Sequence, residues 1–129
     1  MVWVDIVGLL AVVQLIAFGT LVGRARGTYG VAAPATTGHP VFERYYRVQM
    51  NTVESLIVFL PALWLAARYW PPKYAALLGV VYLVGRVLYL FGYVSDPKKR
   101  GAGYGLSMTP VLVLVLAALI GAIRAALAG

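Results

Sequence analysis

The sequence predicts an all-α protein, an integral membrane four-helix bundle that forms a single domain over residues 1–129. Hydrophobic residues make up 62% of the chain and charged residues only 12%, against roughly 25% charged residues in an ordinary soluble domain. The apolar residues gather in four runs, each long enough to cross the hydrocarbon core of a bilayer, about 30 Å thick, as a helix. No tract between these runs is large enough to mark a second domain.

The first predicted span runs from Val2 to Val22 and ends at Gly23. Its start lacks the basic residues of a signal peptide, and its apolar run is longer than a signal peptide requires, so we expect it to be retained. Gln14 is the only strongly polar residue in its middle, and we expect its amide to form a hydrogen bond with a neighbouring helix. A polar loop rich in Gly, Ala, Thr and Pro follows, up to Pro40.

The second predicted span covers residues 41–69 and stops before two consecutive prolines, which cannot continue a helix. At about 1.5 Å per residue it is longer than a bilayer requires, so its first turns should project into the headgroup region. Arg47, Asn51 and Glu54 are spaced i, i+4 and i+7 and therefore share one face of this helix. Glu54 needs a cationic partner, because an unpaired carboxylate near the hydrocarbon is costly.

The third predicted span begins after Pro72 and ends near Tyr93. Its polar residues, Tyr82, Arg86, Tyr89 and Tyr93, follow the spacing i, i+4, i+7 and i+11 and form a single stripe. An arginine inside a span costs roughly 3 kcal/mol on insertion scales, so Arg86 should point into the bundle toward a partner. Glu54 is the expected partner.

The fourth predicted span begins at Thr109 and Pro110, which read as a helix cap followed by a first-turn proline, and ends near Leu127. It is almost purely Leu, Val, Ala and Ile. Arg124 near its end is expected to extend to the membrane interface rather than to act in a site.

The distribution of basic residues predicts how the bundle is oriented. Seven Lys and Arg residues lie around the loops after the first and third spans, and three lie at the opposite side. The positive-inside rule then places the two basic loops in the cytoplasm and both termini on the opposite side. The seven are Arg24, Arg26, Arg44, Arg47, Lys98, Lys99 and Arg100, and the three are Arg68, Lys73 and Arg124.

Composition also argues against several classes of site. The net charge of +7 comes from residues that flank spans, so membrane orientation explains it and we expect no nucleic-acid partner. The chain has no cysteine, and its single histidine, His39, lies in a predicted loop. We therefore expect no metal site and no thiol nucleophile from the protein itself.

The two polar stripes lie toward the same membrane side and can form one site. Guanidinium groups would pair with carboxylates and Glu54 with an ammonium group, which favours a zwitterionic ligand over a metal ion. The candidate site residues are Arg26, Arg47, Gln49, Asn51, Glu54, Arg86, Tyr89, Tyr93 and Arg100.

Two runs of the sequence resemble a known family. The first run consists of Gly38, Phe42, Glu43, Arg44, Tyr45, Tyr46, Val48, Gln49 and Asn51, and the second of Arg86, Tyr89 and Tyr93 followed by Arg100. Together with the four spans, they make the chain similar to the MAPEG family, the membrane-associated proteins in eicosanoid and glutathione metabolism. The resemblance covers nearly the whole chain and is strongest to the branch of cysteinyl-leukotriene synthase and the smaller microsomal glutathione transferases.

The resemblance implies a homotrimer that binds glutathione as co-substrate between neighbouring subunits and transfers it to a lipophilic small molecule drawn from the membrane lipids. The implied glutathione contacts are Arg47, Asn51, Glu54, Arg86, Tyr89 and Tyr93, supported by Gln49 and Arg26. Arg100 is implied as the residue that activates the thiol. Ser55 and Gly27 depart from the family pattern, because a tyrosine and an arginine are expected there.

The charge of the site indicates the chemistry. A thiol with a pKa near 8.5 is mostly protonated at pH 7, and lowering that pKa by about two units requires roughly 2.7 kcal/mol of preferential thiolate stabilisation. A guanidinium in a partly desolvated site can supply this. The thiolate could then act as a transferase nucleophile or reduce a lipid hydroperoxide. A non-catalytic lipid-binding protein of the same fold and a small transporter remain alternative interpretations.

Overall fold

The computed structural model describes all residues, 1–129, and contains only helices. Its four main helices are each long and apolar enough to cross a membrane. The predicted all-α architecture with four spans is therefore confirmed. The four helices are α1 (Val2–Tyr29), α2 (Pro40–Tyr69), α3 (Pro72–Ser95) and α4 (Arg100–Ala128), with a short 3₁₀ helix η1 (Pro97–Lys99) between α3 and α4.

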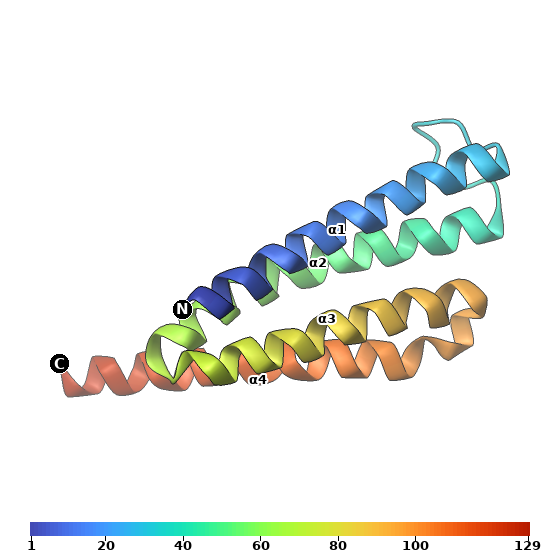
Figure 1. The fold of residues 1–129 in the computed structure, drawn as a ribbon. Coiled ribbons are helices and arrows are strands. Elements are labelled where there is room, and N and C mark those ends of the chain that lie inside the picture. The colour runs from blue at the N-terminus through green and yellow to red at the C-terminus, as the bar shows by residue number, and fades with distance from the viewer.

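The helices pack as two antiparallel pairs, α1 with α2 and α3 with α4 (Figure 1). α2 and α3 each contact all three other long helices, whereas α1 and α4 lie on opposite sides of them. Both termini lie at the end of the bundle that holds the α2–α3 turn, and the other two connections lie at the opposite end (Figure 1). The helices that carry the predicted polar stripes therefore occupy the middle of the bundle.

α1 extends further than the sequence predicted. It continues past Gly23 to Tyr29, and Gly30 ends it in the left-handed conformation at φ 68°, donating its N–H to the Arg26 carbonyl. The extra turns are held by packing, because Val22 and Ala25 are buried in a cluster with Phe42. The predicted loop after Gly23 is thus helical up to residue 29.

α2 begins where the sequence placed it, and His39 has a structural part in that start. Its ring Nδ1 accepts a hydrogen bond from the Val41 backbone N–H at 3.1 Å, which satisfies one free donor of the first turn. The ring also stacks on Tyr29, with centroids 4.2 Å apart. This contact joins the two ends of the α1–α2 loop.

α4 begins nine residues before the predicted start at Thr109. The sequence did not indicate this earlier start, because the three glycines in the first turns are weak helix formers. Pro110 was expected in the first turn of the helix, but it lies inside the helix. The glycines allow α3 and α4 to approach closely, since a Cβ at Gly103 would meet the Tyr89 backbone and one at Gly85 the Ser107 backbone. Close packing over small residues is a common device between membrane helices.

The core between the helices is mostly apolar, with a few specific polar contacts. Gln14 Nε2 donates to the Leu83 carbonyl at 3.0 Å, which confirms the expected interhelical hydrogen bond. Outside the core, Trp64 Nε1 donates to the exposed Asp5 Oδ1 at 2.7 Å, which joins α2 to the start of α1. The Ser55 hydroxyl is buried and lies 2.8 Å from the Tyr82 hydroxyl, so Ser55 joins α2 to α3 inside the bundle.

Candidate functional site

The polar stripes of α2 and α3 meet the start of α4 at a hollow of about 410 Å³. Its lining includes Arg100 and Gly101, which directly follow η1. The hollow therefore lies at the end of the bundle where α3 connects to α4, and Figure 1 shows this end opposite the two termini. Five predicted site residues line it, together with two that the sequence analysis did not select. The lining residues are Arg47, Asn51, Tyr89, Tyr93, Arg100, Gly101 and Tyr104.

Glu54 pairs with Arg47 rather than with Arg86. Glu54 Oε1 lies 3.6 Å from Arg47 Nη1, and the two side chains are 61% and 54% exposed. The predicted Glu54–Arg86 pair does not form, because Glu54 lies on the exposed side of α2 whereas Arg86 is completely buried. The ion pair therefore lies at an accessible surface, one turn of α2 from Asn51.

Arg86 is held by neutral oxygen atoms instead of a carboxylate. Its Nη2 donates to Asn51 Oδ1 at 2.8 Å and to Thr52 Oγ1 at 2.7 Å. Its Nη1 donates to Ser107 Oγ at 3.2 Å. The guanidinium thus links α2, α3 and α4 beneath the hollow.

Three tyrosine rings form an aromatic wall of the hollow. Tyr89 lies 5.6 Å from Tyr93 and 6.1 Å from Tyr104, measured between ring centroids. The rings present hydroxyl groups able to donate hydrogen bonds to an anionic or amide ligand. Arg47 and Arg100 line the same hollow, which makes its surface cationic.

Arg26 and Gln49 lie outside the hollow, on the α1 side of α2. Arg26 donates from Nη1 to the Ala35 carbonyl at 2.6 Å, and its guanidinium lies 4.8 Å from the centroid of the Phe42 ring. The Gln49 amide faces Gly19 of α1. These two predicted residues do not join the others within one chain.

The sequence analysis missed Tyr104, Thr52 and Ser107. Tyr104 lines the hollow, and the other two hold Arg86. A signal was present, because Arg100, Tyr104 and Ser107 are spaced i, i+4 and i+7 and form a third polar stripe. This stripe was not recognised, because the fourth helix was expected to begin only at Thr109.

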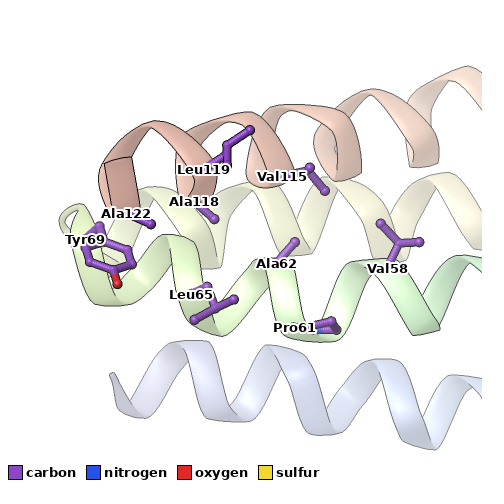
Figure 2. Close-up of a pocket in the computed structure, with 9 residues that line it drawn as sticks. All are labelled: Val58, Pro61, Ala62, Leu65, Tyr69, Val115, Ala118, Leu119 and Ala122. Atoms are coloured by element: carbon purple, nitrogen blue, oxygen red, sulfur yellow. The ribbon is translucent and has the colours of Figure 1, made fainter. Parts of the chain in front are cut away.

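A second hollow, of about 390 Å³, lies between α2 and α4 (Figure 2). Its lining side chains come from these two helices and are almost all apolar (Figure 2). The lining residues are Val58, Pro61, Ala62, Leu65, Tyr69, Val115, Ala118, Leu119 and Ala122. The α2–α4 pair therefore borders a polar hollow at one end and an apolar one toward the other.

The fold and the site define an integral, multi-pass membrane protein with a cationic, tyrosine-lined hollow at one end of its bundle. The chain belongs to the MAPEG family, whose model matches residues 5–120. It is 47% identical over 118 residues to an uncharacterized protein of Synechocystis sp., covering 92% of this chain and 86% of the relative.

Two named relatives are similar over most of their length. Human microsomal glutathione S-transferase 2 is 43% identical over 117 residues, covering 91% of this chain and 78% of the relative. Guinea pig (Cavia porcellus) leukotriene C4 synthase is 42% identical over 122 residues, covering 89% of this chain and 81% of the relative. The residues that line the hollow, which extend from Arg47 to Tyr104, all lie within the family match.

Proposed function

We propose that this protein is a membrane-bound glutathione transferase. The observation that carries the proposal is the convergence of Arg47, Asn51, Tyr89, Tyr93 and Arg100 around one hollow. It is supported by 43% identity to a microsomal glutathione S-transferase. Glutathione is a peptide with two carboxylates, one ammonium group and one thiol. It matches a hollow lined by guanidinium, amide and phenol groups, with the Glu54 carboxylate beside it, 3.6 Å from Arg47 Nη1.

The charges of the site indicate which group of glutathione each residue binds. Arg47 binds a carboxylate through its guanidinium fork, a strong and directional contact. Glu54, 3.6 Å from Arg47 Nη1, binds the ammonium group, so that the ion pair of the free protein opens into two contacts with the zwitterion. Asn51 and the rings of Tyr89 and Tyr93 bind the peptide groups between the ends.

Arg100 stabilises the thiolate. It is exposed at the first position of α4 and lines the hollow. The free N–H groups of the first turn of a helix carry positive partial charge, which adds to the charge of the guanidinium. Both effects favour the ionised form of a sulfur atom placed beside Arg100 and so raise the fraction of reactive thiolate at pH 7.

The reaction is a nucleophilic substitution or addition on a lipophilic electrophile. The thiolate donates its electron pair to an electrophilic carbon to form a sulfur–carbon bond. In a substitution the leaving group departs with the electron pair of the broken bond. A lipid hydroperoxide is a second class of acceptor. The thiolate attacks the terminal peroxide oxygen, the O–O bond breaks and the lipid alcohol leaves after taking up a proton. A second glutathione then reacts with the resulting glutathione sulfenic acid to give glutathione disulfide and water. The bilayer delivers the apolar acceptor to the site.

A trimer completes the site by bringing Arg26 and Gln49 of a neighbouring subunit to the hollow. Within one chain both residues lie on the α1 side of α2, away from the hollow. The outer face of α2 also exposes Ile57, Val58 and Leu65, which are 71%, 44% and 44% exposed. A neighbouring subunit that covers this face buries the apolar side chains and supplies the missing polar ones.

A specific observation favours one alternative, a non-catalytic lipid-binding protein of the same fold. The hollow between α2 and α4 is apolar and almost as large as the polar one, so it could hold an acyl chain without any reaction. In that case the polar residues would stabilise the assembly. Glutathione titration distinguishes the two functions, since only the transferase requires glutathione to bind.

The deciding experiment uses the purified protein in mild detergent. Calorimetric titration with glutathione should give one site per subunit or per subunit interface. Conjugation of glutathione to a chlorinated nitroaromatic should then proceed well above the uncatalysed rate. Absence of both heat and conjugation, with the protein folded, would favour the lipid-binding function.

A further inference from the structure

Arg86 lies behind the hollow, and its contacts reach three of the residues that line it. Its Nη2 donates to Asn51 Oδ1 at 2.8 Å, and its guanidinium carbon lies 4.5 Å from the centroid of the Tyr89 ring. Its Nη1 donates to Ser107 Oγ, whose hydroxyl donates to the Tyr104 carbonyl at 3.0 Å. One buried side chain therefore supports a lining residue on each of α2, α3 and α4.

We propose that Arg86 is a positioning residue: it fixes the Asn51 amide, the Tyr89 ring and the first turns of α4 in the arrangement that receives glutathione, without touching glutathione itself. The proposal rests on the function proposed above for the hollow. It replaces the expectation that Arg86 is a direct glutathione contact.

The burial of Arg86 supports a positioning role. Its side chain is 0% exposed, and it does not line the hollow. Both terminal nitrogens already donate to protein oxygens, Nη2 to Asn51 and Thr52 and Nη1 to Ser107. Its Nε is buried and has no hydrogen-bond partner. The donors of Arg86 are thus directed into the bundle, whereas a guanidinium that binds a ligand keeps a terminal N–H group accessible.

The shape of the side chain fits the same role. A guanidinium is a rigid planar fork, so it can donate to α2 and α4 at once from α3, which a single ammonium group does less well. Its polar partners are neutral oxygens rather than a carboxylate, so its charge remains uncompensated within the chain. That charge adds to those of Arg47 and Arg100 and favours an anionic ligand in the hollow.

The test removes the partners of Arg86 that lie outside the hollow. Ser107→Ala and Thr52→Val should each weaken glutathione affinity about fivefold, as the loss of one buried hydrogen bond implies. Arg86→Gln should weaken glutathione affinity by roughly 30-fold or more, because the variant loses the hydrogen bonds of the guanidinium to both α2 and α4. Arg86→Lys should recover only part of this affinity. Thr20→Val, which removes an exposed hydroxyl bonded within α1, is the matched control and should leave affinity unchanged.

A double variant separates positioning from direct contact. If Ser107 acts only through Arg86, Arg86→Gln combined with Ser107→Ala should bind glutathione no more weakly than Arg86→Gln alone. The proposal is overturned if the two losses add, or if Ser107→Ala and Thr52→Val bind like the wild type while Arg86→Gln abolishes binding. If Arg86→Gln fails to fold, Arg86→Lys and the two partner variants decide the question.

Hydrogen–deuterium exchange provides a measurement that needs no glutathione. Backbone amides of residues 100–107 should exchange faster in Arg86→Gln and in Ser107→Ala than in the wild type, because the start of α4 loses its side-chain hydrogen bond to α3. Unchanged exchange in both variants would overturn the positioning role. A wild-type protein that binds no glutathione would instead overturn the proposed function, and the exchange experiment would still decide the role of Arg86.

Discussion

At the scale of single residues, the three arginines at the hollow differ in what surrounds them. Arg100 is exposed at the first position of α4. Arg47 forms an ion pair with Glu54, with 3.6 Å between Nη1 and Oε1. Arg86 is completely buried among neutral oxygens. An exposed guanidinium can meet a ligand without disturbing the fold, whereas a buried one cannot. Substitutions of Arg100 and Arg47 should therefore affect function more than stability.

Arg100→Ala should lower the conjugation rate at pH 7 by roughly 10- to 30-fold, as expected when a thiol pKa returns from about 6.5 to about 8.5. The defect should shrink as the pH approaches 9, because the thiol of the variant then ionises unaided. The rate and the ultraviolet absorbance of bound thiolate measure this effect. Arg124→Ala, a change of the same kind at the other end of α4, is the control. A defect that is equal at pH 7 and pH 9 would assign Arg100 a geometric role instead.

Glu54→Gln should weaken glutathione affinity by roughly tenfold or more, because the ammonium group loses its carboxylate partner. Its thermal stability in detergent should stay close to that of the wild type, since an exposed ion pair contributes at most about 1 kcal/mol. Glu43→Gln removes another exposed carboxylate from the same helix and should leave affinity unchanged. Equal affinity of Glu54→Gln and wild type would remove Glu54 from the site.

At the scale of helices, the polar residues that share one face of a helix were predictable. The residues that they contact on neighbouring helices were not. Spacing placed Arg47, Asn51 and Glu54 on one face of α2 and correctly brought Asn51 toward α3. Spacing does not give the rotation of one helix relative to another. That rotation decides that Arg86 contacts Asn51 and not Glu54. Periodicity within a helix is a local property, whereas the pairing across helices depends on packing.

The start of α4 was not predictable for a related reason. Gly101, Gly103 and Gly105 reduce the intrinsic helix preference of this segment, and only tertiary packing against α3 compensates for it. The four spans themselves were predictable because bilayer thickness requires long apolar runs. The hollow could be predicted only in part. Three of its lining residues, Arg100, Gly101 and Tyr104, lie in a segment that was expected to be loop, and only Arg100 was selected.

Gly103→Ala should destabilise the protein by about 1–3 kcal/mol, because its methyl group would meet the Tyr89 backbone and force α3 and α4 apart. Gly105→Ala is a matched control on the same helix. A Cβ there meets nothing within 4 Å, so this change should leave stability unchanged or raise it by up to about 1 kcal/mol through helix preference. Thermal unfolding in detergent compares the two variants. Equal unfolding temperatures would contradict close α3–α4 packing.

At the scale of the whole molecule, charge and polarity are distributed unequally along the bundle. The cationic hollow lies at the end that holds the α1–α2 and α3–α4 connections, and both termini lie at the other end (Figure 1). We propose that the former end faces the cytoplasm, where positive residues favour retention. Glutathione, which is soluble in water, would then enter from that side.

Single cysteines test this orientation, since the chain has no cysteine of its own. Thr37→Cys in the α1–α2 loop and Lys98→Cys in η1 should react with a membrane-impermeant maleimide added from the cytoplasmic side. Ala128→Cys should react only from the opposite side. Labelling of Ala128→Cys from the cytoplasm would reverse the proposed orientation.

The position of the hollow has a kinetic consequence. In the proposed orientation, the hollow receives glutathione from water, where its molar concentration determines how often it meets the site. It receives the acceptor from lipid, where the mole fraction of the acceptor does so. Adding detergent at constant bulk acceptor dilutes the acceptor within the micelles and leaves glutathione untouched. The apparent KM for the acceptor, expressed in bulk units, should therefore rise in proportion to micellar detergent, and the KM for glutathione should stay constant. An apparent KM for the acceptor that stays constant as micellar detergent is added would instead place the entry of the acceptor in water.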